Sequence, residues 1–88
     1  MSRDALENEL RALIIDALVL EDMTPADLPR EEPLFGDGVG LDSLDALEIA
    51  LALEETYGIT VDEDDEATKR RFATIASLAE FVSEARAR

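Results

Sequence analysis

Ser43 stands in the stretch GDGVGLDSL, residues 36–44, directly after a glycine-rich segment and an aspartate. A serine in such a place could be a nucleophile, but the chain contains no histidine to act as its base. The nucleophile-elbow pattern G-x-S-x-G is also absent, because residues 41–45 read LDSLD. We therefore do not expect Ser43 to catalyse a reaction unaided, and we do not expect the chain to be an enzyme.

The glycines before Ser43 invite comparison with a nucleotide-binding loop. Gly36 and Gly38 have the first spacing of the dinucleotide fingerprint, but its third glycine would stand at position 41, where the chain has Leu41. The P-loop requires a lysine before its serine or threonine, and no lysine lies near Ser43. We expect these glycines and Gly40 to let a buried loop turn tightly before a helix.

Metal chemistry also finds little support in the sequence. The acidic run DEDDE, residues 62–66, would need a glycine at position 67 and a glutamate at position 73 to form an EF-hand loop, and both positions hold alanine. A weak, loose cation site at this run remains an alternative. The chain has no cysteine, so neither a disulfide nor a zinc–thiolate site is available. We therefore expect no dedicated metal site.

Two roles remain for Ser43 from the residues alone. It could be an ordinary helix cap, which is the commonest role of a serine at a helix start. It could instead be a residue that another enzyme modifies. A helix N-terminus favours a covalently attached phosphate, because its free N–H groups and its dipole stabilise negative charge.

The elements that must position Ser43 are predicted to be helices, because apolar residues recur at helical rather than strand spacing. We expect one domain over residues 1–88 with an all-α fold, a small four-helix bundle of three main helices and one short one. Only a stub of strand is conceivable, at residues 59–61. The helices are expected at about residues 4–20, 43–57 and 65–72, and in a last segment capped by Thr74.

Local signals support these helix ends. Asp4 and Glu7 have capping-box spacing in the first helix, and Asp42 or Ser43 can cap the second. Gly58 followed by an apolar residue is a typical C-terminal stop. The short helix is supported by acid–base pairs at i, i+4, which are Asp65 with Lys69 and Glu66 with Arg70.

The first two main helices are joined by a long connection, about residues 21–42. It contains all three prolines of the chain and three of its four glycines. Four apolar residues within it are expected to tuck into the core and fix the loop across the bundle: Leu28, Leu34, Phe35 and Leu41. A short helical turn could begin near Thr24 or Asp27.

The second helix carries two apolar stripes when its residues are placed at 100° intervals. One stripe is expected to face the core and consists of Ala46, Ile49, Ala50, Leu53 and Tyr57. The opposite stripe, Leu44, Leu47 and Leu51, lies among Glu48, Glu54 and Glu55 and is expected to be an exposed docking face. The small Ala46 and Ala50 leave either room for an apolar guest or a close helix contact.

The charge of the chain indicates which classes of partner it can bind. The net charge is −14, and residues 31–68 hold thirteen acidic residues and no basic one. Nucleic acids and anionic membranes would be repelled, whereas basic protein surfaces would be attracted. No run is long and apolar enough to span a bilayer, and the N-terminal segment has no signal-peptide core, so we expect a cytosolic protein. We expect it to be a monomer.

The segment LFGDGVGLDSLDALEIALALEETYGI, residues 34–59, resembles the signature region of the acyl carrier proteins. The order of elements along nearly the whole chain is similar to that family as well. The GDGVG loop and the stretch DEDDEATKRRFAT depart from the housekeeping fatty-acid carriers and look more like carriers dedicated to polyketide or aryl-polyene-type pathways. The peptidyl carriers resemble the chain less, because they tend to lack so acidic a second helix.

The resemblance implies a carrier of acyl chains on a covalent phosphopantetheine arm. Ser43 would hold the arm, and Asp42 would help a magnesium-dependent phosphopantetheinyl transferase to attach it. The recognition face for basic grooves of partner enzymes, including acyl-transferring and ketosynthase-type enzymes, would be Leu44, Leu47, Glu48, Leu51, Glu54 and Glu55. The alternative is a small acidic adaptor that binds basic proteins without being modified.

Overall fold

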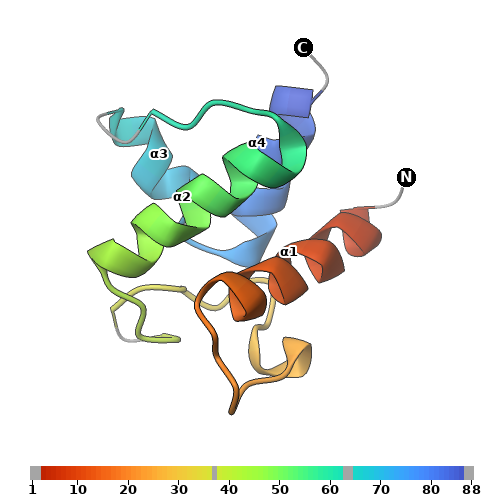
Figure 1. The fold of residues 1–88 in the computed structure, drawn as a ribbon, viewed down its shortest axis with the longest axis vertical. Coiled ribbons are helices and arrows are strands. Elements are labelled where there is room, and N and C mark those ends of the chain that lie inside the picture. Colours follow the sequence, from red (N-terminus) through yellow and green to blue (C-terminus); the bar gives the residue numbers. More distant parts are fainter. Residues whose placement is uncertain (1–2, 37, 63–64, 87–88) are drawn as a thin grey trace.

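The computed structural model describes residues 3–36, 38–62 and 65–86. Its helices are α1 (Arg3–Ala17), the 3₁₀ turn η1 (Pro25–Asp27), α2 (Ser43–Tyr57), α3 (Glu66–Arg71) and α4 (Ile75–Arg86). The described residues contain no strand, so the stub considered at residues 59–61 is absent, and only an isolated bridge joins Phe35 to Leu41. The all-α bundle of three main helices and one short helix is confirmed (Figure 1).

The bounds of α2 follow from residues at its two ends. The Asp42 carboxylate accepts a hydrogen bond from the Asp45 N–H, and the Asp45 carboxylate accepts one from the Asp42 N–H, both at 3.0 Å. This reciprocal box satisfies two donors that a helix start otherwise leaves unpaired. At the other end Gly58 adopts the left-handed conformation, with φ of 65°, and stops the helix. The predicted range 43–57 is confirmed.

The first helix differs from its predicted range at both ends. α1 begins at Arg3, so Asp4 lies inside the first turn and forms no capping box with Glu7. The helix ends at Ala17 because Val19 takes a positive φ of 51° and the Leu20 N–H bonds to Ile15 O. Glu7 turns inward instead of capping the helix, and its side chain is 2% exposed.

The last two helices begin at polar caps. The Asp65 carboxylate accepts from the Ala67 N–H at 2.9 Å, and the Thr74 hydroxyl accepts from the Ser77 N–H at 3.1 Å. The spacing of the acid–base pairs in α3 does not produce contacts. Within the described residues the salt bridges both belong to Glu7, so the cations of α3 pair with no carboxylate.

The core is a single apolar cluster to which α1, α2, α4 and the long loop all contribute. Leu28, Leu34 and Leu41 are buried and Phe35 is half-buried, which confirms that the loop is fixed across the bundle. Its backbone is also tied to the start of α4, since the Leu34 N–H donates to Ala73 O at 2.8 Å and the Ala76 N–H donates to Arg30 O at 2.9 Å.

α1 packs against both α2 and α4, and α3 packs against α4 (Figure 1). Among the described helices, α2 packs mainly against α1, and Leu44, Leu47 and Leu51 of α2 are exposed. Among the described residues, no helix combines the length and the apolar character needed to cross a bilayer.

Candidate functional site

Ser43 is the first residue of α2 and its side chain is exposed. The N-cap of this helix is Asp42, so Ser43 does not fill the capping role that the sequence allowed for it. Among the hydrogen bonds of the described residues, none involves the Ser43 hydroxyl. The capping role is thus filled by its neighbour, and the hydroxyl is left accessible at the positive end of a 15-residue helix.

The other serines of the described chain are placed differently. The Ser77 hydroxyl is part-buried, donates to Arg71 O at 2.9 Å and takes part in the cap of α4. Ser83 is exposed but lies in the middle of α4, away from a helix start. Only Ser43 therefore combines exposure with a helix N-terminus in the part of the chain that the structure describes.

The loop before α2 fixes where Ser43 lies. The Val39 N–H donates to Pro33 O at 2.9 Å, and a side chain at Gly38 would place its Cβ 1.9 Å from the same oxygen. Only glycine permits this approach. The Leu41 N–H then donates to Leu34 O at 3.0 Å, which closes the loop and delivers Asp42 to the helix start. The expectation of tight turning at the glycines is confirmed, but Gly36 and Gly40 are exposed, so the expectation that the turn is buried was wrong.

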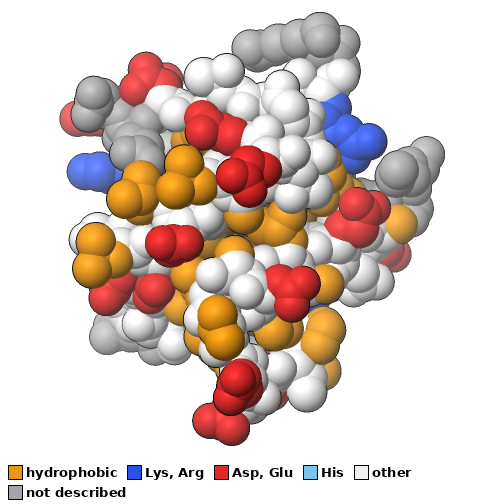
Figure 2. All heavy atoms as spheres, in the orientation of Figure 1, with side chains coloured by type: hydrophobic (Ala, Val, Ile, Leu, Met, Phe, Trp, Pro, Cys, Tyr) orange, Lys and Arg blue, Asp and Glu red, His pale blue; other side chains and the backbone are white. Residues whose placement is uncertain are grey.

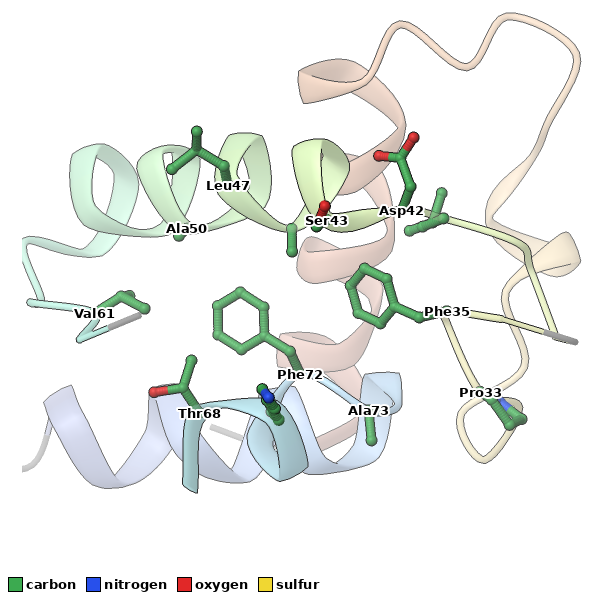
Figure 3. Close-up of a pocket in the computed structure, with 13 residues that line it drawn as sticks. Pro33, Phe35, Asp42, Ser43, Leu47, Ala50, Val61, Thr68, Phe72 and Ala73 are labelled. Atoms are coloured by element: carbon green, nitrogen blue, oxygen red, sulfur yellow. The ribbon is translucent and has the colours of Figure 1, made fainter. Parts of the chain in front are cut away.

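A cavity of about 660 Å³ opens beside Ser43, between α2 and the segment that joins α3 to α4 (Figure 3). Ala46 and Ala50 form part of its α2 wall. The sequence allowed either room for an apolar guest or a close helix contact at these two alanines. The structure has room beside them. The full lining is Pro33, Phe35, Leu41, Asp42, Ser43, Ala46, Leu47, Ala50, Val61, Thr68, Lys69, Phe72 and Ala73.

The outer side of α2 exposes the predicted leucine stripe. Leu44, Leu47 and Leu51 are 71%, 41% and 48% exposed, whereas Leu53 on the opposite side is fully buried. Figure 2 shows apolar side chains among Asp and Glu side chains over this helix. The prediction that α2 carries one buried and one exposed apolar stripe is confirmed. The use of the exposed stripe in docking stays a prediction.

The three glutamates of the predicted recognition face differ in their surroundings. Glu48 and Glu55 are exposed. Glu54 is half-buried, and its carboxylate accepts a hydrogen bond from the Val61 N–H at 2.9 Å. Glu54 thus ties the segment after α2 back to the helix, a role that its place in the stripe did not indicate.

Several lining residues of the cavity were not identified from the sequence as part of a site. Thr68, Lys69 and Phe72 come from α3 and its C-terminal end, and they approach Ser43 only through the tertiary fold. Their spacing along the chain carries no signal of this meeting. The described residues also contain no group of three or more acids that could hold a metal ion, and residues 63–64 of the acidic run lie outside them.

Comparison with known proteins shows which family the chain is similar to. Residues 8–82 match the family model described as "Phosphopantetheine attachment site". The chain is 29% identical to an acyl carrier protein of Akkermansia muciniphila, over 93% of this chain and 98% of that protein. It is 33% identical to an acyl carrier protein of Nitratidesulfovibrio vulgaris strain DP4, over 69% of this chain and 75% of the relative.

Proposed function

This chain belongs to the acyl carrier protein family, and we propose that Ser43 is the residue on which it holds its phosphopantetheine arm. Proteins of this family are carriers rather than catalysts. The observation that carries the proposal is the accessible Ser43 hydroxyl, freed from capping by Asp42, at the start of α2 and on the lining of an apolar cavity.

The residues at this helix start fit the arm. The phosphate of the arm would lie where the helix dipole and free N–H groups favour negative charge. In the attachment step the Ser43 oxygen would bond to the phosphorus that carries the pantetheine, and the pyrophosphate P–O bond from that phosphorus to the nucleotide would break. The nucleotide part leaves as adenosine 3′,5′-bisphosphate, and the serine proton goes to a base of the transferase.

The composition of the chain fits a carrier whose modification is catalysed by the transferase. Without histidine, it depends on the transferase for that base. Without cysteine, it depends on the terminal thiol that the arm supplies when bound, which carries acyl groups as thioesters. The exposed carboxylate of Asp42, next to Ser43, is proposed to help the magnesium-dependent transferase.

The outer stripe of α2 is proposed as the docking face for partner enzymes. Leucines exposed among acids fit a basic groove with an apolar floor. The partners proposed are the transferase and the acyl-transferring and ketosynthase-type enzymes. The proposed contact residues are Leu44, Leu47, Glu48, Leu51, Glu54 and Glu55, and the tie from Glu54 to Val61 leaves Glu48 and Glu55 as the freer charges.

The pathway proposed is fatty-acid or polyketide-type biosynthesis, with an aryl-polyene-type pathway among the latter. The proposal treats residues 1–88 as one carrier domain that works as a monomer in the cytoplasm. Support comes from the family membership and from the unusual glycine-rich loop and α3 segment.

Intact-mass measurement tests the attachment. The protein is incubated with coenzyme A, magnesium and a broad-specificity phosphopantetheinyl transferase. We expect one phosphopantetheine to be added to the wild type and none to Ser43→Ala. Ser83→Ala, which removes an exposed serine elsewhere, is the matched control and is expected to be modified like the wild type. An unmodified wild type with several transferases would favour the unmodified adaptor instead.

A further inference from the structure

The cavity beside Ser43 has two unlike walls. On the α2 side it is bounded by short side chains, Ser43, Ala46 and Ala50. On the opposite side the rings of Phe35 and Phe72 both point toward α2 (Figure 3). Two of the three phenylalanines of the chain therefore face one cavity. The mainly apolar opening between the rings and the alanines is called the slot below, and Leu41, Leu47, Val61 and Lys69 also line it.

The fold holds the ring of Phe72 by packing and the backbone of Phe35 by a bridge. Phe72 is 4% exposed and its ring lies 6.4 Å from the ring of Phe81, measured between centroids. Phe81 is itself covered by the guanidinium of Arg71, which lies 5.0 Å from its centroid. The backbone at Phe35 is held by its bridge to Leu41. The Phe72 part of the aromatic wall is therefore formed before any guest arrives, which reduces the cost of ordering it on binding.

We propose that this slot selects flat, conjugated acyl groups over saturated chains of the same length. The inference rests on the proposed function, since the guest is the acyl group carried from Ser43. An aromatic wall favours a second π-system in stacked or edge-to-face contact beyond the gain from apolar burial. A conjugated chain also has fewer rotatable bonds to immobilise in a narrow slot than a saturated one.

Attachment at Ser43 makes the preference effective at low intrinsic affinity. A group tethered to a lining residue is present at high effective concentration beside the slot. If one class of acyl chain spends more time in the slot than another, the two loaded proteins will differ in stability. The cargo class assigned is thus an acyl group with conjugated double bonds or an aromatic ring, as in polyene or aryl-substituted chains.

Two six-carbon cargoes with the same carbon skeleton test the proposal. Hexanoyl and hexa-2,4-dienoyl groups are loaded from their coenzyme A thioesters by the broad-specificity transferase, and thermal denaturation is measured for each loaded protein. We expect the dienoyl form to melt about 4–8 °C above the hexanoyl form. We also expect proton NMR to show upfield shifts for the dienoyl protons, because they lie over the faces of the phenyl rings.

Aromatic variants locate the effect. Phe35→Leu and Phe72→Leu should each reduce the difference in melting temperature between the two cargoes, and the double variant should remove it. Comparing cargoes within each variant cancels any loss of stability of the protein itself. Tyr57→Leu is the control, because Tyr57 does not line the cavity and its ring faces Arg86, and it should keep the difference.

A second measurement is independent of attachment. The hexanoyl and hexa-2,4-dienoyl thioesters of N-acetylcysteamine are titrated into the unmodified protein and followed by NMR. We expect the dienoyl probe to bind about 3- to 10-fold more tightly. Equal affinities, or equal melting temperatures of the loaded forms, would overturn the inference. Failure of Ser43 to be loaded would overturn the proposed function instead, and the titration would still decide the slot's preference.

Discussion

Glu7 shows how one buried charge can fix a loop. Its carboxylate is almost fully enclosed and accepts a hydrogen bond from the Arg30 guanidinium at 3.0 Å, while Arg11 lies 3.9 Å away on the same helix. Arg11 also donates to Leu28 O at 2.7 Å. These contacts join α1 to the connection that precedes the site, so they help to place the segment leading to Ser43.

Removing Arg30 should therefore cost more than neutralising Glu7. Arg30→Met removes the nearer of the two cations that face the buried Glu7 carboxylate. We expect it to lower the free energy of unfolding by about 1–3 kcal/mol, since Arg11 remains and the charge of the half-exposed Arg30 is partly screened. Glu7→Gln keeps an acceptor for Arg30 and should cost less. Urea denaturation of the two single variants and the double variant measures this. If the double variant loses as much free energy of unfolding as the two single variants together, Glu7 and Arg30 are not coupled.

Tyr57 gives the molecule a pH dependence in the alkaline range. Burial raises the pKa of its phenol above the ordinary value of 10.0, and the nearby Glu9 carboxylate, which accepts its hydrogen bond, adds to that rise in pKa, while Arg86 opposes it. The folded state thus keeps the proton to a higher pH than the unfolded state. The corresponding stability is complete below pH 10 and is lost as the pH rises through the folded pKa.

We expect Tyr57→Phe to lose stability less steeply than the wild type above about pH 10. Chemical denaturation at a series of pH values measures the two slopes. Tyr57 is the sole tyrosine of the chain and there is no tryptophan, so tyrosinate absorbance reports its titration directly. Parallel slopes for the two proteins would show that this phenol does not contribute to the alkaline loss.

At the scale of elements, α2 does two tasks with two faces. Ile49, Ala50 and Leu53 are buried in the core, while Leu44 and Leu47 stand in solvent. A helix that served the core alone would not need the second stripe. The difference in burial predicts that equal truncations on the two faces have unequal effects on folding.

Leu53→Ala should destabilise the protein by about 2–5 kcal/mol, because it leaves a cavity in the core. Leu47→Ala and Glu48→Lys should change stability by less than about 0.5–1 kcal/mol, because both side chains are exposed. The two surface variants should instead slow modification by the transferase, and Glu48→Lys should do so most at low salt, since it reverses a charge that steers a basic partner.

Thermal denaturation beside transferase kinetics makes this comparison. Were Leu47→Ala as destabilising as Leu53→Ala, the outer stripe would be part of the core. Were both surface variants modified at the wild-type rate, the transferase would dock elsewhere. Glu84→Lys, which makes the same charge reversal at an exposed position of α4, controls for the effect of net charge alone.

At the scale of the whole molecule, self-repulsion is the dominant electrostatic feature. A net charge of −14 is held within extents of 35 × 30 × 21 Å, and the basic residues Lys69, Arg70 and Arg71 follow directly after the acidic stretch 31–68. The Debye length is about 30 Å at 0.01 M salt, comparable to the molecule, and about 8 Å at 0.15 M. Screening should therefore stabilise the fold over this range.

We expect the melting temperature to rise between 0.01 and 0.15 M ionic strength, about equally in sodium chloride and magnesium chloride at matched ionic strength. Differential scanning calorimetry in both salts checks this. A flat melting temperature would mean that the acids are spaced widely enough not to repel one another. An extra rise in magnesium would reveal the loose cation site considered at residues 62–66.

The sequence predicted features that depend on neighbours in the chain. The bounds of α2 followed from Asp42 and Gly58, and its two faces followed from helical spacing. It did not predict contacts between distant residues. The partner of Glu7 is Arg30, 23 residues away, and so the local capping box with Asp4 was the wrong interpretation. The meeting of Phe35 and Phe72 at the cavity depends in the same way on how the loop crosses the bundle.

Peptide mapping of the modified protein tests the central claim most directly. Trypsin cleaves after lysine and arginine, and the absence of both between Arg30 and Lys69 leaves residues 31–69 as one peptide in which Ser43 is the single serine. We predict that the whole added mass is found on this peptide and that fragmentation places it on Ser43. Modification of Thr56, Thr60 or Thr68 in that peptide, or of a serine in another, would contradict the account.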